Sequence, residues 1–384
     1  MTFPHLTNVA ISLYNFFMKF VCNGADLSDA ASKVFRAVSP KGLSPILEGI
    51  KVVAKNGFIE LVATDNELTI QKKLLANTLI DGQVVVPGKL FCEFVKRLDF
   101  SDIEISVDSN LRMHIKYGDN KSEILCMSAE EYPTIHKLNN AQQVIMIKSE
   151  LRSMINSVEF CCCLDDSRPI LKGVSLEVED HSIIAVALDG FRLAKSQKPI
   201  ESTTAKMSAV VPRRSLLEVV KIVEDNTEPV SLQFQKNYIM IDLEHTQIIS
   251  RLYDGDFVNY RQIIPGATTT QAIVSREQLA STLERASLVA GKERTNLVKY
   301  DIVDNVLDIA SNSQAGAVSE KLVVTLEGPP IKIAFNATYF MQLLRVITSQ
   351  NIELNFTNPT SPAVIKPSGG VDDTLFLVLP VRLA

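Results

Sequence analysis

Apolar and polar residues alternate with a period of two along much of the chain. Ile103, Ile105 and Val107 alternate with Glu104 and Ser106. The same period returns on either side of a polar turn at 235–237, in Val230, Leu232, Phe234, Ile239, Ile241 and Leu243. Strict alternation predicts strands with one buried face, which pair in antiparallel hairpins joined by short turns.

A helical spacing of apolar residues appears three times, in stretches 86–96, 211–221 and 335–345 that align without gaps. The apolar residues at this spacing are Phe91, Phe94, Val95, Leu216, Val219, Val220, Phe340, Leu343 and Leu344. Each stretch closes on a basic residue, namely Lys96, Lys221 and Arg345. Pro87 and Pro212 are expected at a helix start, where the missing N–H costs nothing. The spacing predicts three copies of one helix.

Other patterns repeat in the same register. A second helix is predicted around the pairs Leu27 and Val34, Leu151 and Val158, and Leu279 and Ala286. Residues 47–50 (Leu-Glu-Gly-Ile) return at 171–174 (Leu-Lys-Gly-Val), and Asp65 returns as Asp189. We therefore expect an α+β fold of three repeated domains, each with two helices packed on antiparallel sheet. The expected domains are 18–140, 141–265 and 266–384, after an N-terminal extension at 1–17.

Composition narrows the class of protein. A hydrophobic content of 46% with 22% charged residues is typical of a globular protein. No stretch has the length and apolarity of a membrane span or the pattern of a signal peptide, so we expect a cytoplasmic protein. The six cysteines include the consecutive Cys161, Cys162 and Cys163, which have no metal-ligand spacing, and we expect reduced thiols.

No catalytic signature is present in the sequence. Phosphate-binding glycine loops, a nucleophile elbow and a zinc-protease motif are all missing. Asp65 and Asp189 recur with the repeat, which favours a turn or cap over a unique reaction. We expect a protein that is not an enzyme and that binds neither a cofactor nor a metal. An enzyme that uses the Asp65 and Asp189 loops or the Cys161 cluster remains an alternative.

Charge is distributed unevenly. The net charge is −5, yet basic residues outnumber acidic ones on the predicted helices and their flanking loops. A localised basic surface is compatible with nucleic-acid binding despite an acidic total. The basic residues are Lys33, Arg36, Lys41, Lys89, Lys96, Arg97, Lys148, Arg152, Arg213, Arg214, Lys221, Arg276, Arg285, Lys292, Arg294 and Arg345.

Taken together, these patterns resemble a known family. The repeated Val-Pro helix, the segments 168–174 (RPILKGV) and 189–194 (DGFRLA), and the terminal 379–383 (LPVRL) are similar to the bacterial DNA polymerase III beta subunit, the replicative sliding clamp. The resemblance runs from about Met18 to Leu383. It implies a homodimeric ring around double-stranded DNA, with the basic residues named above facing the DNA and Lys41 among them. It also implies, as partners, the replicative polymerase, the clamp loader and repair or translesion polymerases. An adaptor that binds proteins without encircling DNA remains the alternative.

The resemblance further implies a hydrophobic pocket for short peptide motifs of these partners. Its residues would be Leu171, Leu188, Gly190, Phe191, Arg192, Leu193, Val258, Ile263, Pro362, Leu377, Leu379, Pro380, Val381, Arg382 and Leu383. Phe191 and Leu188 depart from the His and Thr frequent in the family, which makes the pocket more apolar. The family's dimer would join the first domain to the partner's third, edge strand to edge strand, through the strands around Met113 to Tyr117 and the region of Leu288 and Val289.

Overall fold

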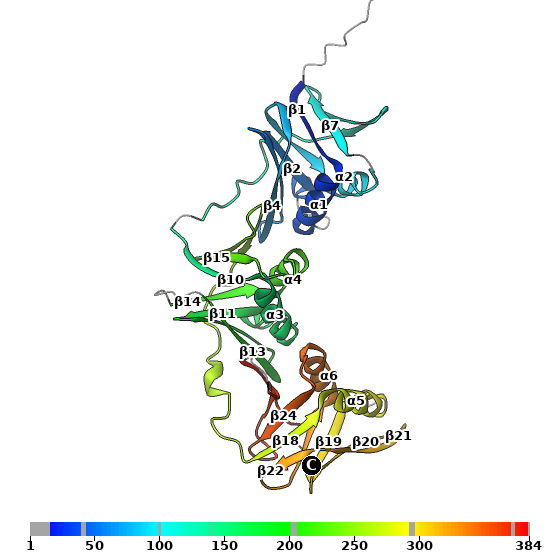
Figure 1. The fold of residues 1–384 in the computed structure, drawn as a ribbon, viewed down its shortest axis with the longest axis vertical. Helices are drawn as coiled ribbons and strands as arrows, with labels where there is room; N and C mark the ends of the chain where they lie inside the picture. The colour runs from blue at the N-terminus through cyan, green and yellow to red at the C-terminus, as the bar shows by residue number, and fades with distance from the viewer. Residues whose placement is uncertain are drawn as a thin grey trace, which may run out of the picture. The chain divides into compact units, whose positions relative to one another are not determined.

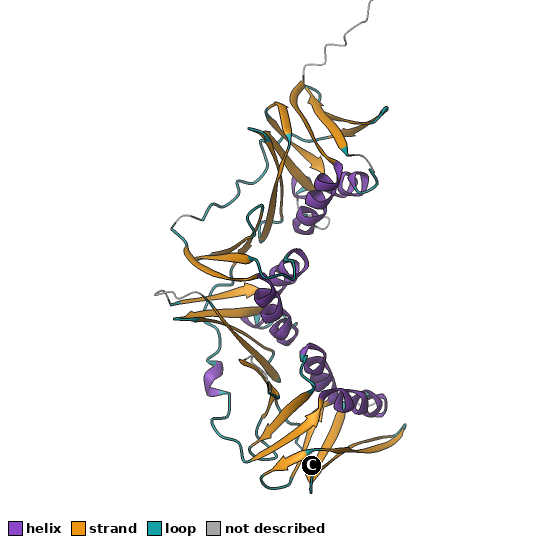
Figure 2. Ribbon diagram, in the orientation of Figure 1, coloured by secondary structure: helices purple, strands orange, loops and turns teal. Residues whose placement is uncertain are grey.

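The computed structural model describes residues 16–39, 44–98, 101–138, 140–200, 206–291, 296–369 and 373–382. The chain divides into two compact units, one made of residues 1–137 and 240–249 and the other of residues 138–239 and 250–384. Figure 1 shows the order of helices and strands along the chain by colour and labels many of them. Figure 2 shows that paired helices cover antiparallel sheet in each unit.

The first unit contains one helix pair and two sheets. Helix α1 (Gly24–Val34) packs on β4 and on α2 (Gly88–Val95). Asn23 caps α1, because its side chain accepts hydrogen bonds from the backbone N–H groups of Ala25 and Asp26. The strands are β1 (Phe16–Asn23), β2 (Gly49–Lys55), β3 (Phe58–Thr64), β4 (Leu68–Leu75), β5 (Asn77–Ile80), β6 (Gly82–Pro87), β7 (Asp102–Asp108), β8 (Arg112–Tyr117) and β9 (Asn120–Leu125).

Two strand orders organise this unit. One sheet runs β5-β1-β7-β8-β9, so that β5 and β9 are its edge strands. In the other sheet the order is β17-β4-β3-β2-β6 within this unit. The first four residues of β17 (Thr246–Arg251) belong to the 240–249 segment. The backbone N–H of Lys73 on β4 donates to the carbonyl of His245 at 2.9 Å. A segment from the middle of the sequence thus completes the first unit.

The second unit contains two copies of the helix pair. Helices α3 (Lys148–Val158) and α4 (Arg213–Ile222) contact each other, as do α5 (Arg276–Ala290) and α6 (Ala337–Val346). The strands are β10 (Gln142–Ile147), β11 (Gly173–Glu179), β12 (Ser182–Leu188), β13 (Arg192–Pro199), β14 (Met207–Pro212), β15 (Pro229–Gln235), β16 (Tyr238–Asp242, which runs on into the first unit), β18 (Thr270–Ser275), β19 (Leu297–Val303), β20 (Val306–Ser313), β21 (Gly316–Val323), β22 (Thr325–Glu327), β23 (Ile331–Asn336), β24 (Asn351–Phe356), β25 (Ala363–Pro367) and β26 (Asp373–Val378).

A nine-stranded sheet joins the two copies in this unit. Its order is β14-β11-β12-β13-β26-β25-β24-β18-β22, and a separate four-stranded sheet runs β21-β20-β19-β23. The central pairing is β13 with β26, in which Leu193 lies opposite Leu377. Strands that are far apart in sequence therefore form one continuous surface, and the candidate site lies on it.

The predicted repeat is confirmed by this architecture. The three aligned stretches form α2, α4 and α6, and the second predicted helix forms α1, α3 and α5. Pro87 and Pro212 are the residues immediately before α2 and α4. Gly49 and Gly173 begin β2 and β11, where a Cβ atom would lie only 2.3 Å from Val85 and 2.7 Å from Val210. This close approach explains why the glycine recurs at equivalent places.

Three details differ from the sequence expectations. Phe16 and Phe17, assigned to the extension, belong to β1, because Phe16 pairs with Asp108 and packs its ring edge-on against His114. Leu243 lies beyond the end of β16 at Asp242. Residues 113–117 lie in β8, which is paired on both sides, so the edge strand is β9 instead.

Within the described ranges, no helix is both long and apolar enough to cross a membrane. The same part of the chain holds no cluster of three or more potential metal ligands. Five of the cysteines are buried and all six are free thiols. Burial raises the pKa of Cys22, Cys126 and Cys162 to about 12, which keeps these thiols protonated and unreactive.

Candidate partner-binding pocket and nucleic-acid interface

The pocket begins at the turn between β12 and β13. Asp189 accepts hydrogen bonds from the backbone N–H groups of Phe191 (2.9 Å) and Arg192 (3.1 Å). Gly190 between them has φ +94°, a conformation that other residues rarely adopt. The turn leaves the side chain of Phe191 58% exposed and directs that of Arg192 inward.

Asp65 forms the equivalent turn in the first unit. Its carboxylate accepts from the N–H groups of Glu67 at 3.0 Å and Leu68 at 2.8 Å. The prediction that Asp65 and Asp189 serve as turn residues is confirmed by these bonds.

Arg192 holds the floor of the pocket in place. Its guanidinium donates to the Asp189 carboxylate (2.9 Å), to the carbonyl of Phe160 (2.8 Å) and to the side-chain oxygen of Gln342 on α6. Its Cζ also lies 4.9 Å from the centre of the Tyr339 ring. Because Gln342 and Tyr339 belong to the third repeat, this one side chain links the two copies of the second unit.

Tyr339 continues this stack outward. Its ring lies 6.1 Å from that of Phe191, with only 19° between the ring planes. Burial raises the pKa of the Tyr339 hydroxyl, which therefore remains protonated. The exposed Phe191 ring is thus supported from beneath and forms a rigid apolar wall.

The pocket itself is apolar and small. It is lined by Leu188, Gly190, Phe191, Arg192, Leu193, Ile263, Leu377 and Leu379. Its volume of about 50 Å³ is far below the roughly 300–1,000 Å³ of a small-molecule site. It is suited to receive single aliphatic or aromatic side chains of a peptide.

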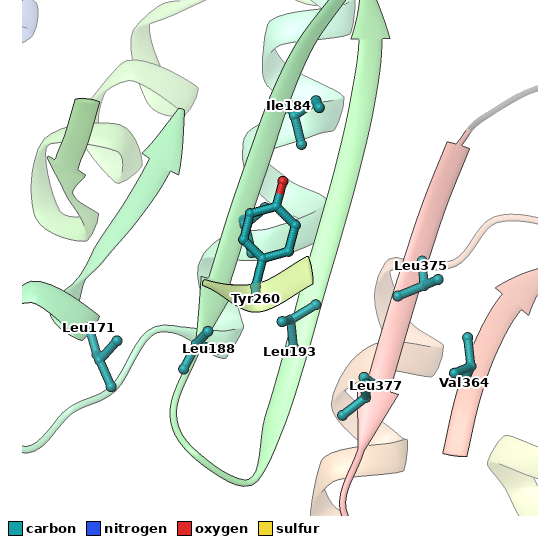
Figure 3. Packing of buried hydrophobic residues seen from close by; sticks show 9 residues of the cluster. Leu171, Ile184, Leu188, Leu193, Tyr260, Val364, Leu375 and Leu377 are labelled. Carbon is teal, nitrogen blue, oxygen red and sulfur yellow. The ribbon is translucent and has the colours of Figure 1, made fainter. Parts of the chain in front are cut away.

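The lining residues Leu188, Leu193 and Leu377 belong to a larger cluster of buried side chains. Figure 3 shows Tyr260 over the β12–β13 hairpin, with Leu188 and Leu193 next to its ring and Leu377 on the neighbouring strand. The cluster comprises Leu171, Ile184, Val186, Leu188, Leu193, Tyr260, Val364, Leu375 and Leu377. Leu171 therefore belongs to the cluster but not to the lining.

All eight lining residues were among those that the sequence resemblance implied. Val258, Pro362, Pro380, Val381 and Arg382 lie outside the lining, and Leu383 lies outside the described residues. The sequence reasoning missed Tyr260, Tyr339, Gln342 and Phe160. Tyr260 lies between Val258 and Ile263, two residues that the resemblance implied, and this is the one signal that could have identified it.

The predicted DNA-facing residues fall into two groups. Lys89, Lys96 and Arg345 are exposed on or next to α2 and α6, and none forms an ion pair with a described residue. Arg36 and Arg214 are also exposed. Lys41, Lys292 and Arg294 lie outside the described residues.

The other predicted cations are engaged within their own unit. Lys33, Arg97, Lys148, Arg213, Lys221 and Arg285 pair with carboxylates. Arg152 donates to the carbonyls of Val220 and Val223 at the end of α4. Arg276 donates to the carbonyl of Leu344 in α6 and to that of Ser349, which follows α6. These last two arginines therefore join the helices of a pair.

Comparison with known proteins identifies the family. Models of the N-terminal, central and C-terminal domains of the DNA polymerase III beta subunit match residues 18–136, 146–259 and 261–382. The chain belongs to the DNA polymerase III beta subunit family. The beta sliding clamp of Staphylococcus aureus is 27% identical over 357 residues, which cover 90% of this chain and 94% of the relative.

Solved beta subunits share the fold. The DNA polymerase sliding clamp from Bacillus subtilis has a TM-score of 0.92 at 28% identity and covers 96% of this chain and 100% of its own. The beta subunit from Thermotoga maritima has a TM-score of 0.89 at 29% identity, with the same coverage. The expected fold of three repeated helix-and-sheet domains is confirmed. Membership in the beta subunit family implies a processivity factor of DNA replication.

Proposed function

We propose that two copies of this chain close into a ring around duplex DNA and hold DNA-processing proteins on it. The observation that carries the proposal is the repeated basic helix within a beta subunit fold. Lys96 and Arg345 occupy equivalent places at the ends of α2 and α6 and remain exposed without a described carboxylate partner. Such side chains attract phosphates without reading bases. A ring that slides requires contacts of this weak, nonspecific kind.

Ring closure is proposed to use sheet edges. β9 and β21 are the outermost strands of their sheets, and an edge strand presents unpaired backbone groups to another chain. Leu125 on β9 is 66% exposed and Val323 on β21 is 81% exposed. Leu288, on α5 next to β21, is exposed as well. We infer that β9 of one copy pairs with β21 of the other.

The pocket is proposed to receive short linear motifs. Its partners would be the catalytic subunit of the replicative polymerase, the clamp loader and repair or translesion polymerases, all in the cytoplasm. The apolar lining and the fixed Arg192 support this role, because anchoring Leu and Phe side chains requires a preformed hydrophobic cleft.

The ring proposal is tested on nicked circular DNA. We expect a two-chain mass in solution, and retention of loaded protein on the circle that disappears when the DNA is linearised. Retention that survives linearisation would indicate ordinary adhesion and refute encirclement. A protein that binds the partner peptide but is never retained on either DNA would instead be a protein-binding adaptor.

A further inference from the structure

A long connecting segment contributes one wall of the pocket. The segment 252–269, called the strap here, joins β17 to β18 and contains one helical turn at Tyr260–Gln262. Ile263, directly after this turn, lines the pocket. Because the strap has no strand partner over most of its length, its position depends on the side chains that fasten it.

Tyr260 is the apolar anchor of the strap. It is 2% exposed, and Figure 3 shows its ring over the β12–β13 hairpin. Its hydroxyl donates to the carboxylate of Glu177 on β11 at 3.2 Å. Burial, and next the nearby Glu177 charge, raise the pKa of this hydroxyl, so that it remains a donor.

Arg261 fastens the strap a second time at the same place. Its guanidinium lies 2.8 Å from the Glu177 carboxylate and 2.7 Å from that of Glu179, both on β11. Its Cζ is 5.0 Å from the Tyr260 ring. Glu177 therefore accepts from two consecutive strap residues, and its side chain is largely buried, whereas Glu179 is half exposed.

The contacts of Tyr260 and Arg261 with β11 are connected to the pocket by one hydrogen-bonded turn. The backbone N–H of Ile263 donates to the carbonyl of Tyr260 at 3.0 Å, so the position of Ile263 follows that of Tyr260. Glu177 is not among the lining residues.

We propose that Glu177 is a positioning residue for partner binding, which sets the pocket wall at Ile263 by holding Tyr260 and Arg261. This rests on the proposed role of the pocket as a peptide site. Affinity for a partner peptide then depends on a carboxylate that the peptide does not touch. A loosened wall costs binding because it must be ordered when the peptide docks.

The test compares peptide affinities in a double-mutant cycle. The probe is a fluorescein-labelled peptide with the clamp-binding segment of a replicative polymerase, followed by anisotropy. We expect Glu177→Ala to weaken binding about tenfold, equivalent to about 1.4 kcal/mol. In an Ile263→Ala background the same change should cost at most about twofold, because the wall is already lost. Equal tenfold effects in both backgrounds, or no effect in the first, would overturn the proposal.

Further variants separate positioning from general instability. Glu177→Gln keeps an acceptor for the Tyr260 hydroxyl and should weaken binding less than Glu177→Ala does. Asp373→Asn is the matched control, since Asp373 pairs with Lys195 at 3.2 Å on neighbouring strands and lies away from the strap fastening on β11. It should leave peptide affinity unchanged.

Hydrogen exchange distinguishes failure of the inference from failure of the peptide site. Without peptide, the Ile263 amide should exchange faster in Glu177→Ala than in the wild type. Unchanged exchange would overturn the fastening itself. If the wild type does not bind the peptide while this exchange difference is present, the peptide site is refuted but the fastening of the strap is retained.

Discussion

The backbone N–H of Leu379 donates to the carbonyl oxygen of Phe191 at 2.8 Å. This bond extends the β13–β26 ladder by one step beyond the pairing of Arg192 with Val378. It places a residue from the end of the described chain beside the exposed aromatic ring of the pocket. The pocket therefore exists only when the two repeats of the second unit are joined.

Deleting residues 379–384 should abolish binding of a polymerase clamp-binding peptide. The deletion removes Leu379 from the lining and releases the carbonyl of Phe191. The two-chain mass should persist, because the proposed edges β9 and β21 are untouched. Anisotropy and light scattering measure both properties, and deleting Ala384 alone is the control. Undiminished peptide affinity after the larger deletion would refute the assigned pocket.

Replacing Arg192 with Ala should destabilise the second unit by about 3 kcal/mol, because it leaves the largely buried Asp189 carboxylate without its cationic partner. The carbonyl of Phe160 also loses its donor. Urea unfolding measures the change. The exposed Arg382 provides a control, and Arg382→Ala should shift stability by less than about 0.5 kcal/mol. Similar losses in the two variants would contradict the structural role of Arg192.

Removing the unpaired helix cations should weaken retention on DNA. In the triple variant Lys89→Ala, Lys96→Ala, Arg345→Ala, the slope of log affinity against log salt should become shallower by about 0.9 for each phosphate that is no longer neutralised. Lys332→Ala is the matched control, because Lys332 is 74% exposed on a strand and pairs with Asp301. A triple variant with the wild-type salt dependence would exclude these residues from the DNA surface.

Asp108 should make the first unit sensitive to acid. A hydrogen bond from His114 Nε2 at 2.9 Å, with further bonds from the N–H groups of Arg112 and Asn110, lowers the pKa of Asp108 below its usual 3.8. A carboxyl with a lowered folded pKa stabilises the fold above its unfolded pKa. That stabilisation is lost as pH falls through the lower, folded value.

Asp108→Asn should therefore reduce stability by about 1–3 kcal/mol near pH 7, since hydrogen bonds to charged groups are strong. The difference from the wild type should shrink below about pH 4. Thermal unfolding between pH 2.5 and 7 measures it, with the exposed Asp119→Asn as control. A difference that is constant over this range would show that the Asp108 charge contributes nothing.

Charging the exposed edge residues should separate the two copies. Leu125→Asp with Val323→Asp places like charges on both proposed partner strands, which opposes pairing. The mass in solution should fall to that of one chain. Leu79, exposed on the opposite edge strand β5, provides the control, and Leu79→Asp should remain a dimer. A two-chain mass in the double variant would rule out these edges.

Local patterns were sufficient to predict the helices and the repeat. Phe91 and Val95 lie on one buried helix face, as do Leu216 and Val219. The helical spacing of apolar residues over a few positions is enough to predict such a face. β9 was harder to identify, because an edge strand with a polar sequence shows little alternation. The expected region centred on β8, whereas the edge of the sheet is the next strand, β9.

The interior of the pocket could not be read from local patterns. Arg192 meets Gln342, 150 positions away, and Tyr260 meets Glu177, 83 positions away. Nothing near a tyrosine in sequence distinguishes a buried anchor from a surface residue. The pairing of β13 with β26 brings Arg192 near Gln342, and the 252–269 segment brings Tyr260 against β11.

The pairing of β17 with β4 bears on how the chain can be divided. A fragment that ends near residue 140 would follow the sequence repeat but would lack residues 240–249. β4 would then be an open edge, with its N–H and C=O groups free to recruit a strand from another molecule. Such a fragment should aggregate or exchange strands, whereas adding back a peptide of residues 238–251 should keep it monomeric. We therefore expect the first repeat to need residues 240–249 to close its sheet.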